Sequence, residues 1–276
     1  MPLTAAGLVR KMRGGAQAHL LETDDGGWYV VKFRNNPQHR RILVNELLAS
    51  ALLDYLKIAA PPVALVQVTT AFLEAHPEVH LTLGSRQMPV EPGWHFGSQY
   101  PGDPTRVAVY DFLPDTLLSG VANIEDFRAI LVFDKWVANA DGRQCVFHRA
   151  RVSRGDAPAG GETKPVFVAR MIDHGYAFNG PHWDFPESAV QGLYARRQVY
   201  ESVTSLDDFQ PWLEQVVNFP EEVMDRAWKQ IPPDWIEGDE DNLEQLLEKL
   251  YARRKRVPEL LAASRDSRID PFPNWR

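Results

Sequence analysis

The chain has 276 residues, of which 44% are hydrophobic and 24% charged, and its net charge is −7 at pH 7. This length can bury the core of one large domain or of two lobes, and the negative charge argues against a protein that coats nucleic acid, so we expect no direct nucleic-acid contact. The single cysteine excludes an internal disulfide, and every long apolar stretch is interrupted by charges or prolines, so we expect a cytoplasmic protein with no membrane span.

A glycine pair stands before a predicted β-hairpin near the N-terminus. Alternating apolar residues lead to an Asp-Asp-Gly-Gly sequence at 24–27, which is typical of a hairpin turn, and residues 28–33 then read as a strand that carries Lys32 near its end. Gly14 and Gly15 precede this hairpin, where a glycine loop would let backbone N–H groups approach phosphates. An ordinary turn is the alternative for the glycine pair alone.

A helix is predicted over residues 42–57, where apolar residues recur at near-helical spacing. It carries Glu46, which is either a solvated helix residue or the partner of Lys32 in an ion pair. A strand lysine paired with a helix glutamate is the arrangement that kinases use to orient the lysine toward nucleotide phosphates. A Pro-Pro pair ends the helical stretch, and residues 63–69 alternate like a strand.

The middle of the chain gives weaker signals before a second helix. Residues 70–106 are rich in Pro and Gly and read as irregular, and residues 107–112 read as a buried strand or short apolar run. A helix is predicted over residues 124–138, with Asn123 as its N-cap residue and an acidic residue, Asp126, three positions later.

The loop at 139–144 is polar in an otherwise apolar stretch, which is where function rather than packing is expected. Asp141 in this loop is either a turn residue that ends the helix or a chemical group at the mouth of a strand. Residues 149–164 are basic and polar and read as an exposed hairpin tip.

A return strand is predicted over residues 165–172, and Asp173 follows it. Asp173 reads as a metal ligand and Gly175 as the residue that permits a sharp turn, although a β-turn with an exposed aspartate is the alternative. His174 is expected to orient or pack rather than to bind metal, because a hard cation such as Mg²⁺ prefers oxygen ligands. The remainder is mostly helical, and we expect an extended or poorly ordered tail over residues 267–276.

Asp141 and Asp173 together change the interpretation. Two carboxylates at adjacent strand ends could hold a metal-bound phosphate donor and receive a proton from a hydroxyl group. Phosphoryl transfer uses this division of labour, because the protein mainly positions groups and stabilises charge. The pair therefore predicts an ATP-dependent kinase.

Five segments resemble, in order and spacing, the motifs of HipA-like kinases, which are bacterial proteins with a divergent protein-kinase fold. Type II phosphatidylinositol 4-kinases use similar end motifs. The segments are Gly14-Gly15, Val-Val-Lys-Phe at 30–33, Asn45-Glu46, Phe-Asp-Lys-Trp-Val-Ala-Asn-Ala-Asp at 133–141 and Ile-Asp-His-Gly-Tyr-Ala-Phe at 172–178.

The resemblance implies an α+β, two-lobed fold with a small β-rich N-lobe over residues 1–112 and a mainly helical C-lobe over residues 113–276. It implies an enzyme that uses ATP and Mg²⁺ and phosphorylates Ser or Thr of a protein. In family members that act as toxins the partner is a DNA-binding antitoxin, so an antitoxin-like partner is possible here.

The resemblance also assigns roles to single residues. Asp141 would be the catalytic base, and Lys32, positioned by Glu46, would contact the ATP phosphates. Asp173 would bind Mg²⁺. The glycine pair, Gly14 and Gly15, would belong to the phosphate-covering loop.

One departure leaves other functions open. The family usually places a metal-binding asparagine five residues after the catalytic aspartate, and this chain has Val146 there. Gln144 or Asn139 could supply an amide oxygen to the metal instead. The alternatives are a nucleotide-binding pseudokinase or scaffolding module, and a kinase of small molecules or lipids.

Overall fold

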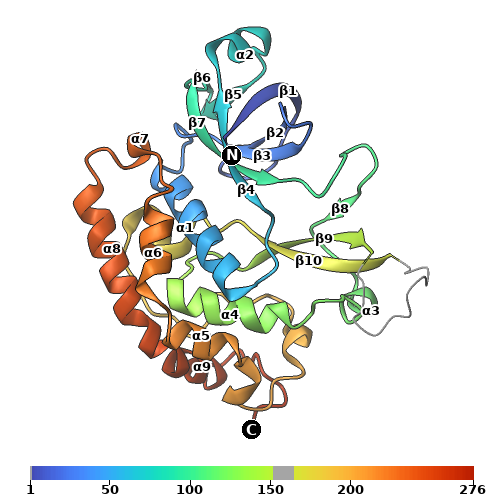
Figure 1. The fold of residues 1–276 in the computed structure, drawn as a ribbon. Helices are drawn as coiled ribbons and strands as arrows, with labels where there is room; N and C mark the ends of the chain where they lie inside the picture. The colour runs from blue at the N-terminus through green and yellow to red at the C-terminus, as the bar shows by residue number, and fades with distance from the viewer. Residues whose placement is uncertain (1, 152–164) are drawn as a thin grey trace.

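A closed five-stranded barrel forms the β-rich lobe in a computed structural model that describes residues 2–151 and 165–276 (Figure 1). Strand β1 pairs in parallel with β4 and closes the barrel, and the other neighbouring strands pair antiparallel. The barrel order is β1-β2-β3-β7-β4, with bounds β1 (Leu3–Lys11), β2 (His19–Thr23), β3 (Trp28–Lys32), β4 (Val63–Val68) and β7 (Gly93–Gln99).

The predicted hairpin at 24–27 is confirmed, but the prediction that residues 70–106 are irregular is wrong. This stretch contains α2 (Thr70–Ala75), the hairpin β5 (His80–Leu83) and β6 (Arg86–Pro89), and strand β7. Strand β7 is not predicted from the sequence because two of its seven residues are glycine, which is unfavourable in strands. Gly97 is needed for close packing, since a Cβ atom there would lie 2.6 Å from Val66 Cγ2 on the neighbouring strand β4.

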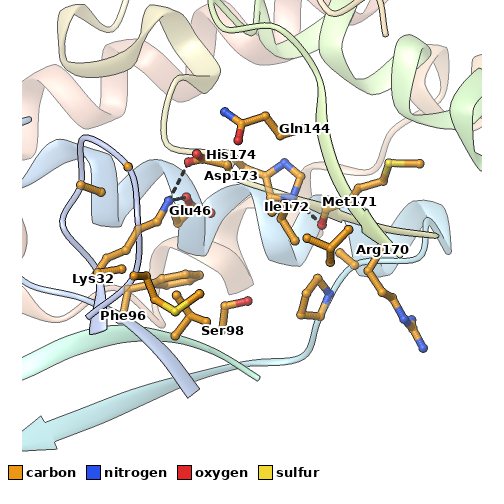
Figure 2. Close-up of a pocket in the computed structure, with 18 of the residues that line it drawn as sticks. Lys32, Glu46, Phe96, Ser98, Gln144, Arg170, Met171, Ile172, Asp173 and His174 are labelled. Carbon is orange, nitrogen blue, oxygen red and sulfur yellow. Dashed lines mark hydrogen bonds and ion pairs between the residues drawn. The ribbon is translucent and has the colours of Figure 1, made fainter. Parts of the chain in front are cut away.

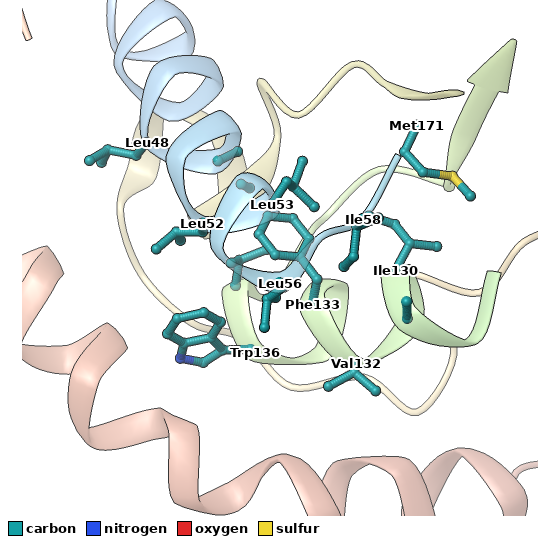
Figure 3. Packing of buried hydrophobic residues seen from close by; sticks show 14 of the residues in the cluster. Leu48, Leu52, Leu53, Leu56, Ile58, Ile130, Val132, Phe133, Trp136 and Met171 are labelled. Carbon is teal, nitrogen blue, oxygen red and sulfur yellow. The ribbon is translucent and has the colours of Figure 1, made fainter. Parts of the chain in front are cut away.

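Helix α1 (Arg41–Leu56) lies between the barrel and the second lobe, close to the predicted 42–57. It is buried on nearly every side, as expected for a helix that packs against both lobes. Figure 3 shows its lower end, where Leu53 and Leu56 pack near Phe133 and Trp136 of the second lobe. The core therefore continues from one lobe into the other through α1.

Helices make up most of the second lobe, and a three-stranded sheet, β10-β9-β8, lies on the side that faces the barrel. The sheet contains β8 (Val109–Tyr110), β9 (Gln144–Ala150) and β10 (Val166–Ile172). The helices are α3 (Asp115–Leu118), α4 (Asp126–Val137), α5 (Trp212–Val217), α6 (Glu221–Trp228), α7 (Pro233–Ile236), α8 (Glu240–Arg253) and α9 (Val257–Arg265). Short 3₁₀ helices are η1 (Ala177–His182), η2 (Arg197–Tyr200), η3 (Leu206–Phe209) and η4 (Arg254–Arg256).

Two local predictions around this sheet are wrong. Asn123 does not cap α4; instead, its side chain accepts a hydrogen bond from the Ala169 N–H group at 2.8 Å and donates to Asp126, so it ties β10 to the start of the helix. The segment 107–112 is not buried, because Tyr110 and Phe112 are 44% and 60% exposed. β8 instead forms the edge of the sheet.

The tail is also better packed than predicted. Phe272 is buried, and its ring contacts those of Tyr200, Phe209 and Trp275. Most of the predicted hairpin tip, residues 152–164, lies outside the described residues. No helix in the described chain is long and apolar enough to span a membrane.

Candidate functional site

A cavity of about 580 Å³ lies between the barrel and the three-stranded sheet. It is lined by most of the residues that the sequence singled out, although they come from distant segments. These are Gly14, Gly15, Lys32, Glu46, Asp141, Gln144 and Asp173. Asn139 is not among the lining residues.

Lys32 contacts two carboxylates in this cavity. Its Nζ atom donates to Asp173 Oδ1 at 2.7 Å and to Glu46 Oε1 (Figure 2). Glu46 is almost completely buried, whereas the Asp173 side chain is 37% exposed. The ion-pair interpretation of Glu46 is therefore the one that the structure shows, and the solvated interpretation is wrong.

Burial and charge act in opposite directions on these groups. Burial disfavours the Lys32 ammonium, but the adjacent Glu46 and Asp173 carboxylates outweigh it and raise the pKa of Lys32. Burial likewise disfavours the Asp173 carboxylate, and the nearby ammonium outweighs this effect and lowers its pKa. Lys32 is thus a fixed cation and Asp173 a fixed anion over the physiological pH range.

The glycine pair lies in the turn between β1 and β2 at the edge of the cavity. Gly14 has a φ of +118°, a region that side chains rarely adopt. At Gly15 a Cβ atom would lie 2.7 Å from Gln38 Nε2. The backbone here can approach a ligand that enters the cavity without Cβ obstruction.

The Asp141 loop begins where α4 ends at Ala138, whose φ of +49° turns the chain out of the helix. Asp141 is exposed, and its carboxylate accepts hydrogen bonds from the Gly142 N–H group at 2.8 Å and from Gln144 Nε2 at 3.1 Å. Asn139 is buried beneath it and accepts a hydrogen bond from the Asp141 N–H group through its side-chain oxygen. Asn139 thus shapes the loop, while Gln144 lies at the cavity with Asp141.

The Asp173 loop passes close to helix α1. We predicted the sharp turn at Gly175, but it lies at Asp173 itself, which has a φ of +60°, whereas Gly175 does not have a positive φ. Gly175 is required for a different reason, since a Cβ atom there would lie 2.5 Å from Ile42 Cγ2. Asn45 fixes this approach, because its buried side-chain amide donates to the Gly175, Ala177 and Gly180 carbonyl oxygens.

A buried ion pair that the sequence analysis missed connects the two loops. Arg143 donates to the Asp134 carboxylate, to the Ile172 carbonyl at 2.9 Å and to His174 Nδ1 at 3.3 Å. Both charged side chains are completely buried. Asp134 also accepts from Asn139, so the network runs from the segment before Asp173 to the loop that carries Asp141.

His174 is buried, as expected for a packing residue. Burial and the adjacent Arg143 lower its pKa well below the ordinary value, so the ring is neutral at pH 7. Its two nitrogens lie against Arg143 and the Met171 carbonyl. It therefore has no free nitrogen for a metal, in agreement with the prediction.

The donor set suits a divalent cation bound together with phosphates. Mg²⁺ in such sites uses one or two carboxylates and several oxygens of the ligand or water. The described residues contain no cluster of three or more His, Cys, Asp or Glu side chains that would hold a metal without further ligands. Asp173 keeps one carboxylate oxygen without a hydrogen bond inside the described protein, and Asp141 lines the same cavity.

Comparison with known proteins identifies solved structures with a similar fold. The fold resembles that of the Golgi casein kinase, in one structure with Mn/ADP bound (TM-score 0.54, 12% identity, 96% of this chain and 74% of that chain) and in a second (TM-score 0.53, 13% identity, 96% and 73%). The Helicobacter pylori proinflammatory kinase CtkA also matches, with a TM-score of 0.37, 13% identity and coverage of 94% and 93%. No curated protein matches the sequence.

The two Golgi casein kinase structures confirm the predicted kinase-like fold, with its β-rich and helical lobes. A family model described as HipA-like kinase matches residues 7–260, which is most of the sequence. The chain therefore belongs to the family of HipA-like kinases.

Proposed function

We propose that the protein is an ATP- and Mg²⁺-dependent kinase that transfers the γ-phosphoryl group to a hydroxyl group of Ser or Thr in a protein. The observation that carries the proposal is the contact of Lys32 with both Glu46 and Asp173 in a cavity that Asp141 also lines. Family membership supports the same class of reaction.

Lys32 would bind phosphate oxygens, because its charge is fixed and its position is held by a buried carboxylate. The two carboxylates on Lys32 differ in exposure: Glu46 is 3% exposed and Asp173 is 37% exposed. Glu46 is thus the permanent partner, while Asp173 can leave the lysine and bind a cation. Gly14 and Gly15 would cover the phosphates with backbone N–H groups.

Asp141 would accept the proton of the attacking hydroxyl group, since it is exposed at the cavity and has no cation as a partner in the described structure. Gln144 would hold its carboxylate and could offer its amide oxygen to a metal. Mg²⁺·ATP, when bound, supplies the phosphoryl group and neutralises its negative charge. Asn139, the other predicted metal ligand, would act from below by fixing the loop.

The test is transfer of label from γ-labelled ATP to the protein itself or to a generic Ser/Thr substrate, with and without Mg²⁺. We expect transfer by the wild type and at least a 100-fold loss in Asp141→Asn, which keeps the size of the side chain. Asp184→Asn, which changes an exposed aspartate outside the cavity, is the matched control. Equal transfer by the wild type and Asp141→Asn would refute the role of the base.

A pseudokinase is the second candidate, and the position of Val146 favours it. Val146 on β9 lies in the three-stranded sheet that forms the floor of the cavity, and its apolar side chain stands where relatives place a metal-binding asparagine. Thermal-shift titration separates the two, because a bound ligand raises the apparent stability. Stabilisation by ATP that does not depend on Mg²⁺, without any label transfer, would favour the pseudokinase.

Other parts of the hypothesis remain predictions. They are the acceptor (protein, small molecule or lipid), an antitoxin-like partner, a cytoplasmic location and the lobe boundary at residue 112. Strand β8, just before this boundary, pairs with β9 beyond it, so we propose that the boundary segment belongs structurally to the floor of the cavity.

A further inference from the structure

The floor of the cavity continues well beyond the residues that would hold phosphates. On β9 the alternate residues Gln144, Val146 and His148 face the cavity, and on β10 Ile172 and Arg170 do so. The register pairs Gln144 with Ile172 and Val146 with Arg170. Because residues on a strand rise about 3.3 Å each, Arg170 lies roughly 10 Å along the floor from Asp173.

Arg170 is a cation at the end of this floor, and no carboxylate of the described residues forms an ion pair with it. Among the described residues its side chain makes no ion pair and no hydrogen bond. Asp126 is near enough for the charge of Arg170 to act on its pKa, but its carboxylate already accepts hydrogen bonds from Asn123 and the Ala59 N–H group. Figure 2 shows Arg170 on the far side of the pocket from Lys32.

His148 adds a second unsatisfied group to this end of the cavity. Its side chain is 7% exposed, and Nδ1 is buried without a hydrogen-bond partner among the described residues. Burial and the nearby Arg170 lower the pKa of His148, so it is neutral at pH 7 and each ring nitrogen can make one hydrogen bond. Because Nδ1 is shielded from the cavity, a ligand there would meet the other ring nitrogen of His148, Nε2.

The segment 99–102 forms part of the wall opposite the floor, and it has no unpaired backbone N–H group to offer. The Gln99 N–H group donates to the Pro62 carbonyl at 2.8 Å and the Tyr100 N–H group to the Trp28 carbonyl at 2.7 Å. Pro101 has no N–H group, and that of Gly102 donates to the Tyr100 carbonyl. A base bound against this wall must find its hydrogen-bond donors in side chains.

We propose that Arg170, with His148 beside it, reads the base of the bound nucleotide, and that the protein accepts GTP at least as efficiently as ATP. This inference rests on the proposed kinase function. It follows from the chemistry of the two bases. Guanine presents O6 and N7 as acceptors, which match the donors of a guanidinium group, whereas the amino group of adenine is itself a donor that arginine cannot accept.

The experiment compares the binding of GDP and ADP, each with Mg²⁺, by titration calorimetry, and the use of GTP and ATP by kcat/KM. The wild type should bind GDP at least as tightly as ADP. Arg170→Met should weaken GDP binding about tenfold or more and ADP binding much less. Arg170→Gln should shift preference toward ADP, because glutamine can pair with both the amino group and N7 of adenine.

Arg149→Met is the matched control, since Arg149 is exposed on β9 and does not line the cavity. It should leave the affinities for both nucleotides unchanged. Wild-type binding of GDP more than tenfold weaker than that of ADP, or equal losses for both in Arg170→Met, would overturn the proposal. Binding with the expected preference but without phosphoryl transfer would refute kinase activity alone, and binding of neither nucleotide would refute both.

Discussion

Replacing Arg143 with methionine should destabilise the protein by about 3 to 5 kcal/mol, because it leaves a buried carboxylate without its cation. Asp134 is completely buried and accepts two of its hydrogen bonds from Arg143, including one from Nε at 2.8 Å. After the replacement, the one side-chain hydrogen bond that the Asp134 carboxylate keeps among the described residues is that from Asn139 at 2.9 Å. The Ile172 carbonyl also loses its donor.

Urea and thermal unfolding measure the effect, and a loss of this size lowers the melting temperature of a chain of this length by roughly 6 to 20 °C. Arg256→Met is the matched control. Arg256 also pairs with a carboxylate, Glu187, but its side chain is 51% exposed. Surface pairs of this kind contribute about 1 kcal/mol or less, so the control should melt close to the wild type.

A double variant separates lost charge pairing from lost packing. Asp134→Asn combined with Arg143→Met removes both charges, so no uncompensated carboxylate remains and part of the stability should return. Recovery should be incomplete, since the Ile172 carbonyl still lacks its donor. An Arg143→Met variant within about 1 kcal/mol of the wild type, or purely additive effects in the double variant, would refute this reasoning.

Three further predictions concern the site and the barrel. Asp173→Ala should abolish the Mg²⁺ dependence of the stabilisation by ATP in a thermal-shift titration, yet leave the protein folded without nucleotide, since Asp173 is partly exposed. A large drop in the melting temperature without nucleotide would show instead that Asp173 has a structural role. Gly14→Ala should weaken nucleotide binding about tenfold, because Gly14 has a φ of +118° that alanine rarely adopts. Gly26→Ala is the control for backbone strain alone, since Gly26 lies in a distant turn and has a φ of +75°. Equal nucleotide affinity in the two variants would contradict the role of Gly14. Burial lowers the pKa of His95 from 6.5 to about 4, so below pH 6.5 the unfolded chain binds a proton that the folded chain does not. The stability of the wild type should therefore fall as pH drops from 6.5 to 4, by about 1.4 kcal/mol per pH unit at most. Urea unfolding of His95→Gln, which cannot titrate, should show a shallower pH dependence, and equal slopes in the two proteins would refute the assignment.

The elements with strong local signals could be predicted from the sequence. Apolar periodicity predicts helix α1, turn residues predict the hairpin at 24–27, and an apolar run predicts the returning strand β10. Strand β7 could not be recognised, because its pairing with β3 and β4 depends on segments far away in the chain. The closure of the barrel could not be predicted either, since it depends on two paired residues between β1 and β4, one of which is the pair Leu3 and Val66.

The candidate site divides in the same way. Lys32, Glu46 and Asp173 could be selected because their residue types and order match a chemical task, and the structure brings them into contact. Arg143 and Arg170 could not be assigned, because a lone arginine in a strand or loop has no distinctive spacing. Arg143 is defined by its contact with the Asp134 carboxylate, and Arg170 by the lack of such a contact within residues 2–151 and 165–276.

Asn45 stood in one of the segments selected from the sequence, yet its role in holding the site could not be assigned there. Its amide bonds the Gly175 carbonyl, 130 positions away, at 2.7 Å, and its oxygen accepts from Trp183 Nε1 at 2.8 Å. A reacting carboxylate must remain near the cavity, so its chemistry restricts where it can lie. A positioning amide needs only the correct neighbours, and these are fixed once α1 has packed against the Asp173 loop. Because Gly175 allows that loop to touch the helix, the position of Asp173 depends on packing in α1 as much as on its own strand.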